Sequence, residues 1–294
     1  MYYRRKIALA LLQVFDETMG KTKFQKLLLL FTKMQEKPDY QFVPYKYGCF
    51  SFQATADIYT MQKYQQVIVS NEGITKTDPT DYMSLLKDKD KHCLNRLYSL
   101  HNNKGYKDLI RYTYTEYPYF AIHSEIADRF LTREELARVR MFRPQNNRTI
   151  MYTIGYEGIS LEEYLNKLIA ADVRVLVDVR NNPVSMKYGF TRGQLLNACS
   201  KVGIEYMHFP EVGIKSEQRR ELVTQDDYDV LFETYREENL PNTINTQEQI
   251  LALLKDKYRI ALTCFEANVC QCHRKHLAEA ITQLPKWNYE LIHL

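Results

Sequence analysis

The sequence has no hydrophobic run long enough to cross a membrane. A transmembrane helix needs about 20 consecutive apolar residues, and no run in this chain of 294 residues approaches that length. The first residues also lead into nothing like the apolar segment of a secretory signal. We therefore expect a cytoplasmic protein with no membrane partner.

Cysteine is scarce, with six residues in all, three of which crowd into positions 264–272. Six cysteines in a chain of this size do not make a disulfide scaffold, and in a reducing compartment they are thiols, metal ligands or redox groups. Neither positive nor negative charge is in large excess. The net charge of +4 permits nucleic-acid binding without requiring it.

The chain is rich in what a folded core needs. Its composition is 45% hydrophobic and 26% charged, and its length suits two domains. The stretch Pro144-Gln-Asn-Asn has the composition of a linker, so we predict one domain at 1–148 and a second at 149–294.

The chain has 23 tyrosines. Tyrosine suits base stacking or partner contacts, although most tyrosines pack half-buried in a core.

The first domain is predicted to be mainly helical. Helical patterns cover 3–19, 21–34 and 51–64, the last opening on Ser51 as an N-cap, and 66–69 and 73–77 are predicted to form a hairpin. This order is typical of a winged-helix module. Another helical segment is expected from Ser124. Six arginines then follow within residues 129–148. They form either a solvated helix face or a face that contacts phosphate groups.

Two motifs give this first third of the chain a family resemblance. Phe24-Gln-Lys-Leu-Leu-Leu-Leu and Tyr45-Lys-Tyr-Gly-Cys-Phe-Ser resemble the SocA-like (Panacea) antitoxin domain, although Cys49 stands where that family has proline. The resemblance implies a protein- or nucleic-acid-interaction module, and it carries over no catalytic group.

The second domain has the alternating pattern of an α/β fold. Helical segments are predicted near 160–171, 192–202, 227–238, 246–257 and 272–284, and strand-like runs at 150–155, 173–179, 204–209, 258–264 and 289–294. Strands separated by helices imply right-handed crossovers. We predict a doubly wound, mostly parallel, Rossmann-like sheet.

Ligands of such sheets bind just beyond the carboxyl ends of the strands. Four predicted strands end in polar or ionisable groups, so we expect these groups to meet at one edge: Tyr156 and Glu157, then Asp178, Arg180 and Ser185, then His208, and lastly Cys264 and Glu266.

Asp178 and Arg180 are two residues apart, so in an extended chain both side chains point to the same side. They form either a structural ion pair or an arginine fork for a phosphate or carboxylate, with Asp178 orienting it or acting as a base. Ser185 then contacts a ligand or closes a turn.

Cys272, His273 and Arg274 fall where the last long helix is predicted to begin. A helix N-terminus lowers the pKa of a thiol, so we expect Cys272 to be partly ionised. One interpretation is an anion site and another is a nucleophilic cysteine with Glu266 or His273 as proton carrier. The third is zinc bound by Cys264, Cys270, Cys272 and His273. The spacing matches zinc sites poorly and there is no second, distant ligand pair, so we predict no metal ligand.

Five motifs together resemble the domain-of-unknown-function family numbered 488 over nearly all of residues 150–294. They are Thr153-Ile-Gly-Tyr-Glu-Gly, Val177-Asp-Val-Arg-Asn-Asn-Pro-Val-Ser, Phe190-x-x-x-x-Leu195, Gly203-Ile-Glu-Tyr-Met-His-Phe-Pro, and Cys264-Phe-Glu with Cys272-His-Arg. The resemblance implies a compact α/β domain whose shared polar residues match Tyr156, Glu157, Asp178, Arg180, Pro183, Ser185, Cys264, Glu266, Cys272, His273 and Arg274. Glu211-Val-Gly departs from the family's Leu-Gly-Gly.

The leading hypothesis is an enzyme, or an enzyme-derived domain, of hydrolase or transferase type that acts on a nucleotide or nucleic-acid component. Its catalytic residues are Glu266 or Asp178 as acid/base, Cys272 as nucleophile and His273. The substrate-binding residues are Tyr156, Glu157, Arg180, Ser185, Cys264 and Arg274. The alternative is a non-catalytic regulator that binds DNA or a protein through its first domain and senses a small anion in its second. No cofactor is identified.

Overall fold

The computed structural model describes residues 1–15, 18–215, 218 and 224–294. The chain divides into two compact units, Met1–Arg143 and Pro144–Leu294, a few residues before the division predicted at 148/149. Within the described residues, no helix combines the length and apolar character that a membrane span requires.

The C-terminal unit is a parallel α/β sheet, as predicted. Its strands are β6 (Ile150–Gly155), β7 (Val175–Asp178), β8 (Glu205–His208), β9 (Arg259–Cys264) and β10 (Glu290–His293). Its helices are α7 (Leu161–Ala170), α8 (Arg192–Lys201), α9 (Gln225–Thr234), α10 (Ile244–Lys257) and α11 (His273–Thr282). Each lies within a few residues of its predicted range.

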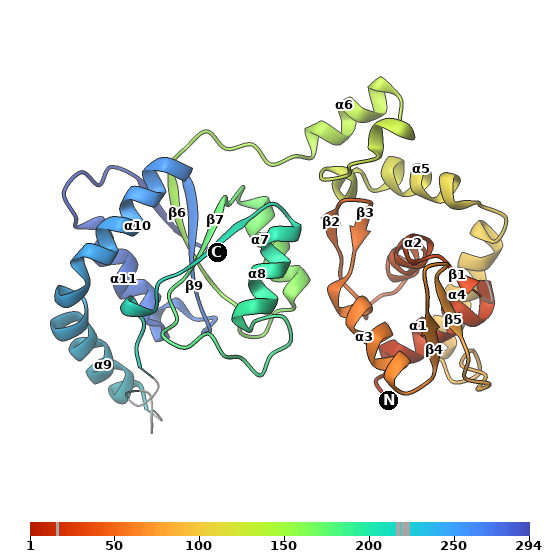
Figure 1. The fold of residues 1–294 in the computed structure, drawn as a ribbon, viewed down its shortest axis with the longest axis horizontal. Helices are drawn as coiled ribbons and strands as arrows, with labels where there is room; N and C mark the ends of the chain where they lie inside the picture. The colour runs from red at the N-terminus through yellow and green to blue at the C-terminus, as the bar shows by residue number, and fades with distance from the viewer. Residues whose placement is uncertain (16–17, 216–217, 219–223) are drawn as a thin grey trace. The chain divides into compact units, whose positions relative to one another are not determined.

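The five strands pair in the order β10-β6-β9-β7-β8, and every pairing is parallel. Figure 1 shows α7 and α8 on one face of this sheet and α10 and α11 on the other, as a doubly wound sheet requires. The order differs from the consecutive order of a Rossmann half, because β9 inserts between β6 and β7. The central strands β6, β7 and β9 are buried almost throughout.

Helices form both layers because their apolar stripes match the sheet. On one face, Leu254 of α10 and Leu277 of α11 pack in one cluster with Val177 and Leu262 of the sheet. On the other side, Leu161, Leu165 and Leu168 of α7 are buried. Ser160 begins α7 by accepting a hydrogen bond from the Glu163 amide at 3.0 Å.

The N-terminal unit is mainly helical. Its helices are α1 (Tyr3–Phe15), α2 (Lys21–Thr32), α3 (Phe52–Lys63), α4 (Asp88–His101), α5 (Tyr106–Glu116) and α6 (Arg133–Met141). Its strands are β1 (Thr18–Met19), β2 (Val43–Tyr45), β3 (Gly48–Phe50), β4 (Val67–Val69) and β5 (Ile74–Lys76). The predicted hairpin is present as antiparallel β4 and β5, and Ser51 caps α3 through the Ala54 amide at 3.1 Å.

Some predictions for this unit were wrong in detail. The strands β2 and β3, which were not predicted, form an antiparallel pair. The helix expected from Ser124 begins instead at Arg133, where Thr132 makes a capping box with Glu135. Residues 16–17 of the predicted helix 3–19 lie outside the described residues, and 18–19 form β1, which pairs with β5.

One buried histidine gives this unit a predicted pH dependence. His101, at the end of α4, is 1% exposed, and burial together with Lys104 lowers its pKa to about 4. An unfolded histidine has a pKa of about 6.5, so below that pH the unfolded chain binds a proton that the folded chain does not. We therefore expect stability to fall as the pH decreases from about 6.5 towards 4, and to be unaffected by His101 above that window.

A His101→Gln variant should lose less stability across this window. The measurement is native-state hydrogen exchange of α4 amides, with protection factors compared at two pH values on either side of the histidine's unfolded pKa. His92→Gln is the matched control because His92 is exposed on the same helix. Equal losses in wild type and His101→Gln would contradict the prediction.

Candidate functional site

Three neighbouring strands bring their carboxyl ends to one edge of the sheet. Gly155 of β6 lies opposite Cys264 of β9, and Asp178 of β7 lies opposite Thr263. The polar residues that follow each strand are therefore adjacent, although they are far apart in sequence. All ten predicted site residues lie at or just beyond these strand ends or at the start of α11.

Asp178 and Arg180 form a buried, two-pronged ion pair. Arg180 donates from Nε to Asp178 Oδ1 at 2.8 Å and from Nη2 to Oδ2 at 2.5 Å. The two side chains are 0% and 7% exposed. Tyr206 also donates its hydroxyl to Asp178 at 2.7 Å. Arg180 Nη1 donates to the Tyr156 hydroxyl at 2.7 Å and to the Phe190 carbonyl at 2.9 Å. The arginine fork is thus largely occupied by partners from the chain itself.

Tyr156 connects this pair to the loop after β7. Its ring stacks on Phe190, with centroids 4.2 Å apart and planes 9° from parallel. Burial raises the pKa of its phenol, although Arg180 and a hydrogen bond with Ser185 act in the opposite direction. Ser185 also accepts from the Lys187 amide at 3.2 Å. Asp178, Arg180, Tyr156 and Ser185 therefore form one hydrogen-bonded group.

A second group joins the end of β9 to the start of α11. Cys264 Sγ lies 3.3 Å from Glu266 Oε2 and 3.6 Å from His273 Nδ1. One ligand-type atom from each of Cys264, Cys272 and His273 lies within 4.8 Å of the others, and all three residues are buried. His273 Nε2 donates to the Val179 carbonyl at 3.0 Å. Because Val179 lies between Asp178 and Arg180, this bond links the two groups.

The expectation that Cys272 is partly ionised was wrong. The residue caps α11 but is 0% exposed. Burial raises the pKa of its thiol well above the ordinary value, and Cys264 and Glu266 add to the rise, whereas Arg274 lowers the pKa. Desolvation and two acidic neighbours therefore outweigh the helix N-terminus.

Arg274 and Glu157 hold the loop between β9 and α11. Arg274 is 1% exposed, and it donates from Nη1 to the Glu266 carbonyl at 2.5 Å and from Nη2 to the Ala267 carbonyl at 3.2 Å. Glu157 accepts from the Ala267 amide at 2.9 Å. In this structure Arg274 thus bonds the backbone, whereas the sequence led us to expect it to face an anion.

Several contributors were missed in the sequence. Lys187 is partly buried and donates from Nζ to the Tyr156 carbonyl at 2.5 Å; burial lowers its pKa. Tyr164 donates to Thr263 Oγ1 at 2.7 Å. Tyr206 could have been found, because it stands two residues before His208 on β8 and so faces the same side of the strand. Lys187 lies in a loop with no periodic signal.

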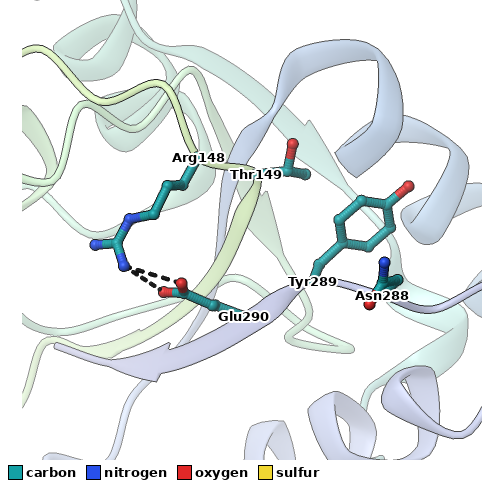
Figure 2. Close-up of a pocket in the computed structure, with 5 residues that line it drawn as sticks. All are labelled: Arg148, Thr149, Asn288, Tyr289 and Glu290. Carbon is teal, nitrogen blue, oxygen red and sulfur yellow. Dashed lines mark hydrogen bonds and ion pairs between the residues drawn. The ribbon is translucent and has the colours of Figure 1, made fainter.

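A pocket lies at the other edge of the same sheet. It is lined by Arg148, Thr149, Asn288, Tyr289 and Glu290, at the amino ends of β6 and β10. Figure 2 shows the Arg148–Glu290 ion pair beside it, with N–O distances of 2.9 Å. The pair is largely exposed, and the pocket contains none of the predicted site residues. The carboxyl edge therefore remains the candidate site.

Residues 160–281 match the family model described as "Domain of unknown function DUF488". This match confirms, over that segment, the family resemblance predicted from the motifs. Tyr156 and Glu157 precede the matched segment, and the family's description names no activity. No curated protein and no solved structure matches the chain. The SocA-like resemblance of the N-terminal segment stays a prediction.

Proposed function

We propose that the α/β unit is an enzyme, or a domain derived from one, that acts on a nucleotide or nucleic-acid component at the carboxyl edge of its sheet. The observation that carries this proposal is the accumulation of bonded ionisable groups on three adjacent strand ends, represented by Asp178, Arg180 and Glu266. Burying charges lowers stability unless they are well paired, and such groups concentrate at functional sites.

Glu266 is the better acid/base of the two predicted carboxylates. It is partly exposed and can therefore reach a bound molecule, whereas Asp178 is fully buried and bonded to Arg180 and Tyr206. Asp178 is assigned the role of positioning Arg180. Cys272 is a poor nucleophile here because its thiol is buried and its pKa is raised.

The substrate class follows from the charges around this edge. Lys187 is a partly buried cation, and the Ser185 hydroxyl and the exposed Glu157 carboxylate lie on the same strand ends. The Lys187 ammonium suits a phosphate, and the Ser185 hydroxyl and Glu157 carboxylate suit the hydroxyl and amino groups of a sugar or base. The chemistry proposed is hydrolysis or group transfer, with Glu266 moving the proton.

A Glu266→Gln variant tests the proposal. The full chain is screened against nucleotides and short oligonucleotides, with products separated by chromatography. Loss of a general acid/base is expected to reduce kcat by about 10²- to 10⁴-fold. Glu205→Gln is the matched control because Glu205 is an exposed residue at the amino end of β8. Equal kcat for wild type and Glu266→Gln on a turned-over substrate would exclude this role for Glu266.

A second candidate is a regulator that binds DNA or a protein through the N-terminal unit and a small anion through the α/β unit. The observation that favours it is the three-stranded sheet β1-β5-β4 that accompanies α1, α2 and α3, an element order typical of winged-helix modules. The exposed side chains of Tyr59, in α3, and Tyr64, just after it, would be available for contacts. Salt-dependent DNA binding by the full chain, with no turnover in the screen, would favour this candidate.

A further inference from the structure

We propose that Cys264, Cys272 and His273 bind a Zn²⁺ ion whose fourth position is open to water or a bound molecule, with the Glu266 carboxylate beside Cys264 but not a ligand. The set joins the last residue of β9 to the first turn of α11. The proposal concerns metal binding and does not depend on the reaction proposed above. It differs from the zinc interpretation of the sequence, which also included Cys270.

The distances between donor atoms fit tetrahedral zinc. With Zn–S and Zn–N bonds of about 2.3 and 2.0 Å, tetrahedral angles place a thiolate sulfur about 3.5 Å from a ligating nitrogen. Cys264 Sγ lies 3.6 Å from His273 Nδ1. The Cys272 sulfur completes the group within 4.8 Å of the other two buried ligand atoms.

The tautomer of His273 is already the one that a metal needs. A carbonyl oxygen only accepts hydrogen bonds, so the 3.0 Å contact of Nε2 with Val179 O fixes the proton of the neutral ring on Nε2. The lone pair of Nδ1 then points towards Cys264. Zinc-bound histidines commonly bond a backbone carbonyl or carboxylate through their second nitrogen in this way.

The charges also balance around a divalent cation. Two ligating thiolates and the neighbouring Glu266 carboxylate carry three negative charges, so a bound Zn²⁺ leaves one, which the charge of Arg274 offsets. Arg274 is fully buried beside this group, and its positive charge acts to lower the pKa of the Cys272 thiol. Its Nε has no hydrogen-bond partner among the described residues. Two sulfurs and an imidazole are the donors preferred by zinc, whereas magnesium and calcium prefer oxygen.

Cys270 supplies the matched control. It lies two residues before Cys272, but its side chain is exposed and its sulfur accepts a weak hydrogen bond from Lys275 Nζ at 4.0 Å. If the metal were bound by loosely arranged surface thiols, Cys270 would take part. If the buried group binds it, Cys270 is dispensable.

The experiment measures the metal content of the purified full chain by mass spectrometry after growth with zinc. We expect one zinc per chain in wild type and in Cys270→Ser, and loss of most of the zinc in Cys264→Ser and Cys272→Ser. Glu266→Gln should still fold and bind zinc, but a chelator competition should give a Kd raised by about 10- to 100-fold, by analogy with changes around other metal sites. Replacement by Co²⁺ should give a sulfur-to-cobalt charge-transfer band in wild type and in Cys270→Ser.

Absence of zinc from wild type with no such cobalt band would overturn the proposal, and so would equal zinc content in Cys264→Ser and wild type. A Cys264–Cys272 disulfide in the purified protein, detected as a mass two hydrogens lower, would also overturn it. If the cysteine variants do not fold, the cobalt spectrum of the folded wild type still tests whether sulfur binds the metal. Zinc bound without turnover contradicts only the proposed enzymatic function, and turnover by a chain that cannot bind metal contradicts only the zinc site.

Discussion

Asp178→Asn is expected to lower the free energy of unfolding of the α/β unit by about 3–5 kcal/mol. The substitution keeps the shape of the side chain and removes its charge. Arg180 is then left as a buried cation, 7% exposed, without its carboxylate. Tyr206 also loses its charged acceptor. The cost arises because an unpaired buried charge is far less stable than the pair, not because the pair itself is strongly stabilising.

The chain's one tryptophan makes this loss of stability measurable. Trp287 lies in the α/β unit and packs against its core, so urea titrations followed by its fluorescence report on that unit. Glu205→Gln is the control: it breaks the exposed Lys257–Glu205 pair, whose side chains are 36% and 51% exposed, and such a pair is worth less than about 1 kcal/mol. If Asp178→Asn costs no more than Glu205→Gln, Arg180 is hydrated and the ion pair is not a buried one.

A double variant separates the two causes of instability. Asp178→Asn combined with Arg180→Met removes the orphaned charge as well as the carboxylate, and we expect it to recover a large part of the loss, since apolar replacements of buried pairs are often nearly neutral. No recovery would mean that shape and hydrogen bonding to Tyr156 and Phe190, rather than charge, explain the instability.

The sequence predicted the elements of the α/β unit and the edge at which polar groups gather. Runs rich in β-branched residues, such as 173–179, indicate strands buried on both faces, because helices cover both faces of a parallel sheet. The carboxyl-edge rule then places Tyr156, Asp178 and Cys264 together without any knowledge of strand order. The same-side placement of Asp178 and Arg180 follows from the period of a strand, and the structure pairs them.

What could not be predicted depends on contacts between distant segments. The insertion of β9 between β6 and β7 leaves no local pattern in the sequence, yet it brings His273 within hydrogen-bond distance of the Val179 carbonyl at the end of β7. The pKa of Cys272 was predicted in the wrong direction because the helix N-terminus is visible in the sequence, whereas the burial and acidic neighbours that dominate are not. Arg274 likewise looked available, but its partners are backbone carbonyls that no motif specifies.

The loop that carries Glu266 depends on a close approach at Gly155, and this gives the second large prediction. Gly155 pairs with Cys264 at the end of the β6–β9 ladder. A Cβ added at Gly155 would lie 1.9 Å from the Glu266 carbonyl oxygen and 2.7 Å from its carbon. No rotamer change can relieve a clash with backbone, so β6 or the loop must move.

Gly155→Ala is expected to destabilise the α/β unit by about 3 kcal/mol or more, at the upper end for overpacking. The displaced carbonyl is the one that accepts from Arg274 Nη1, so the loop should also lose order. Hydrogen exchange should show this loss of order as weaker protection of the Ala267 amide, which donates to Glu157 in the wild type.

Gly193→Ala in α8 is the control, because no atom lies within 4 Å of its added Cβ. The Gly193→Ala substitution should raise the free energy of unfolding by up to about 1 kcal/mol, because alanine has a higher helix propensity than glycine. A Gly155→Ala protein as stable as wild type, with unchanged protection at Ala267, would show that β6 and the Glu266 loop are not held in this contact.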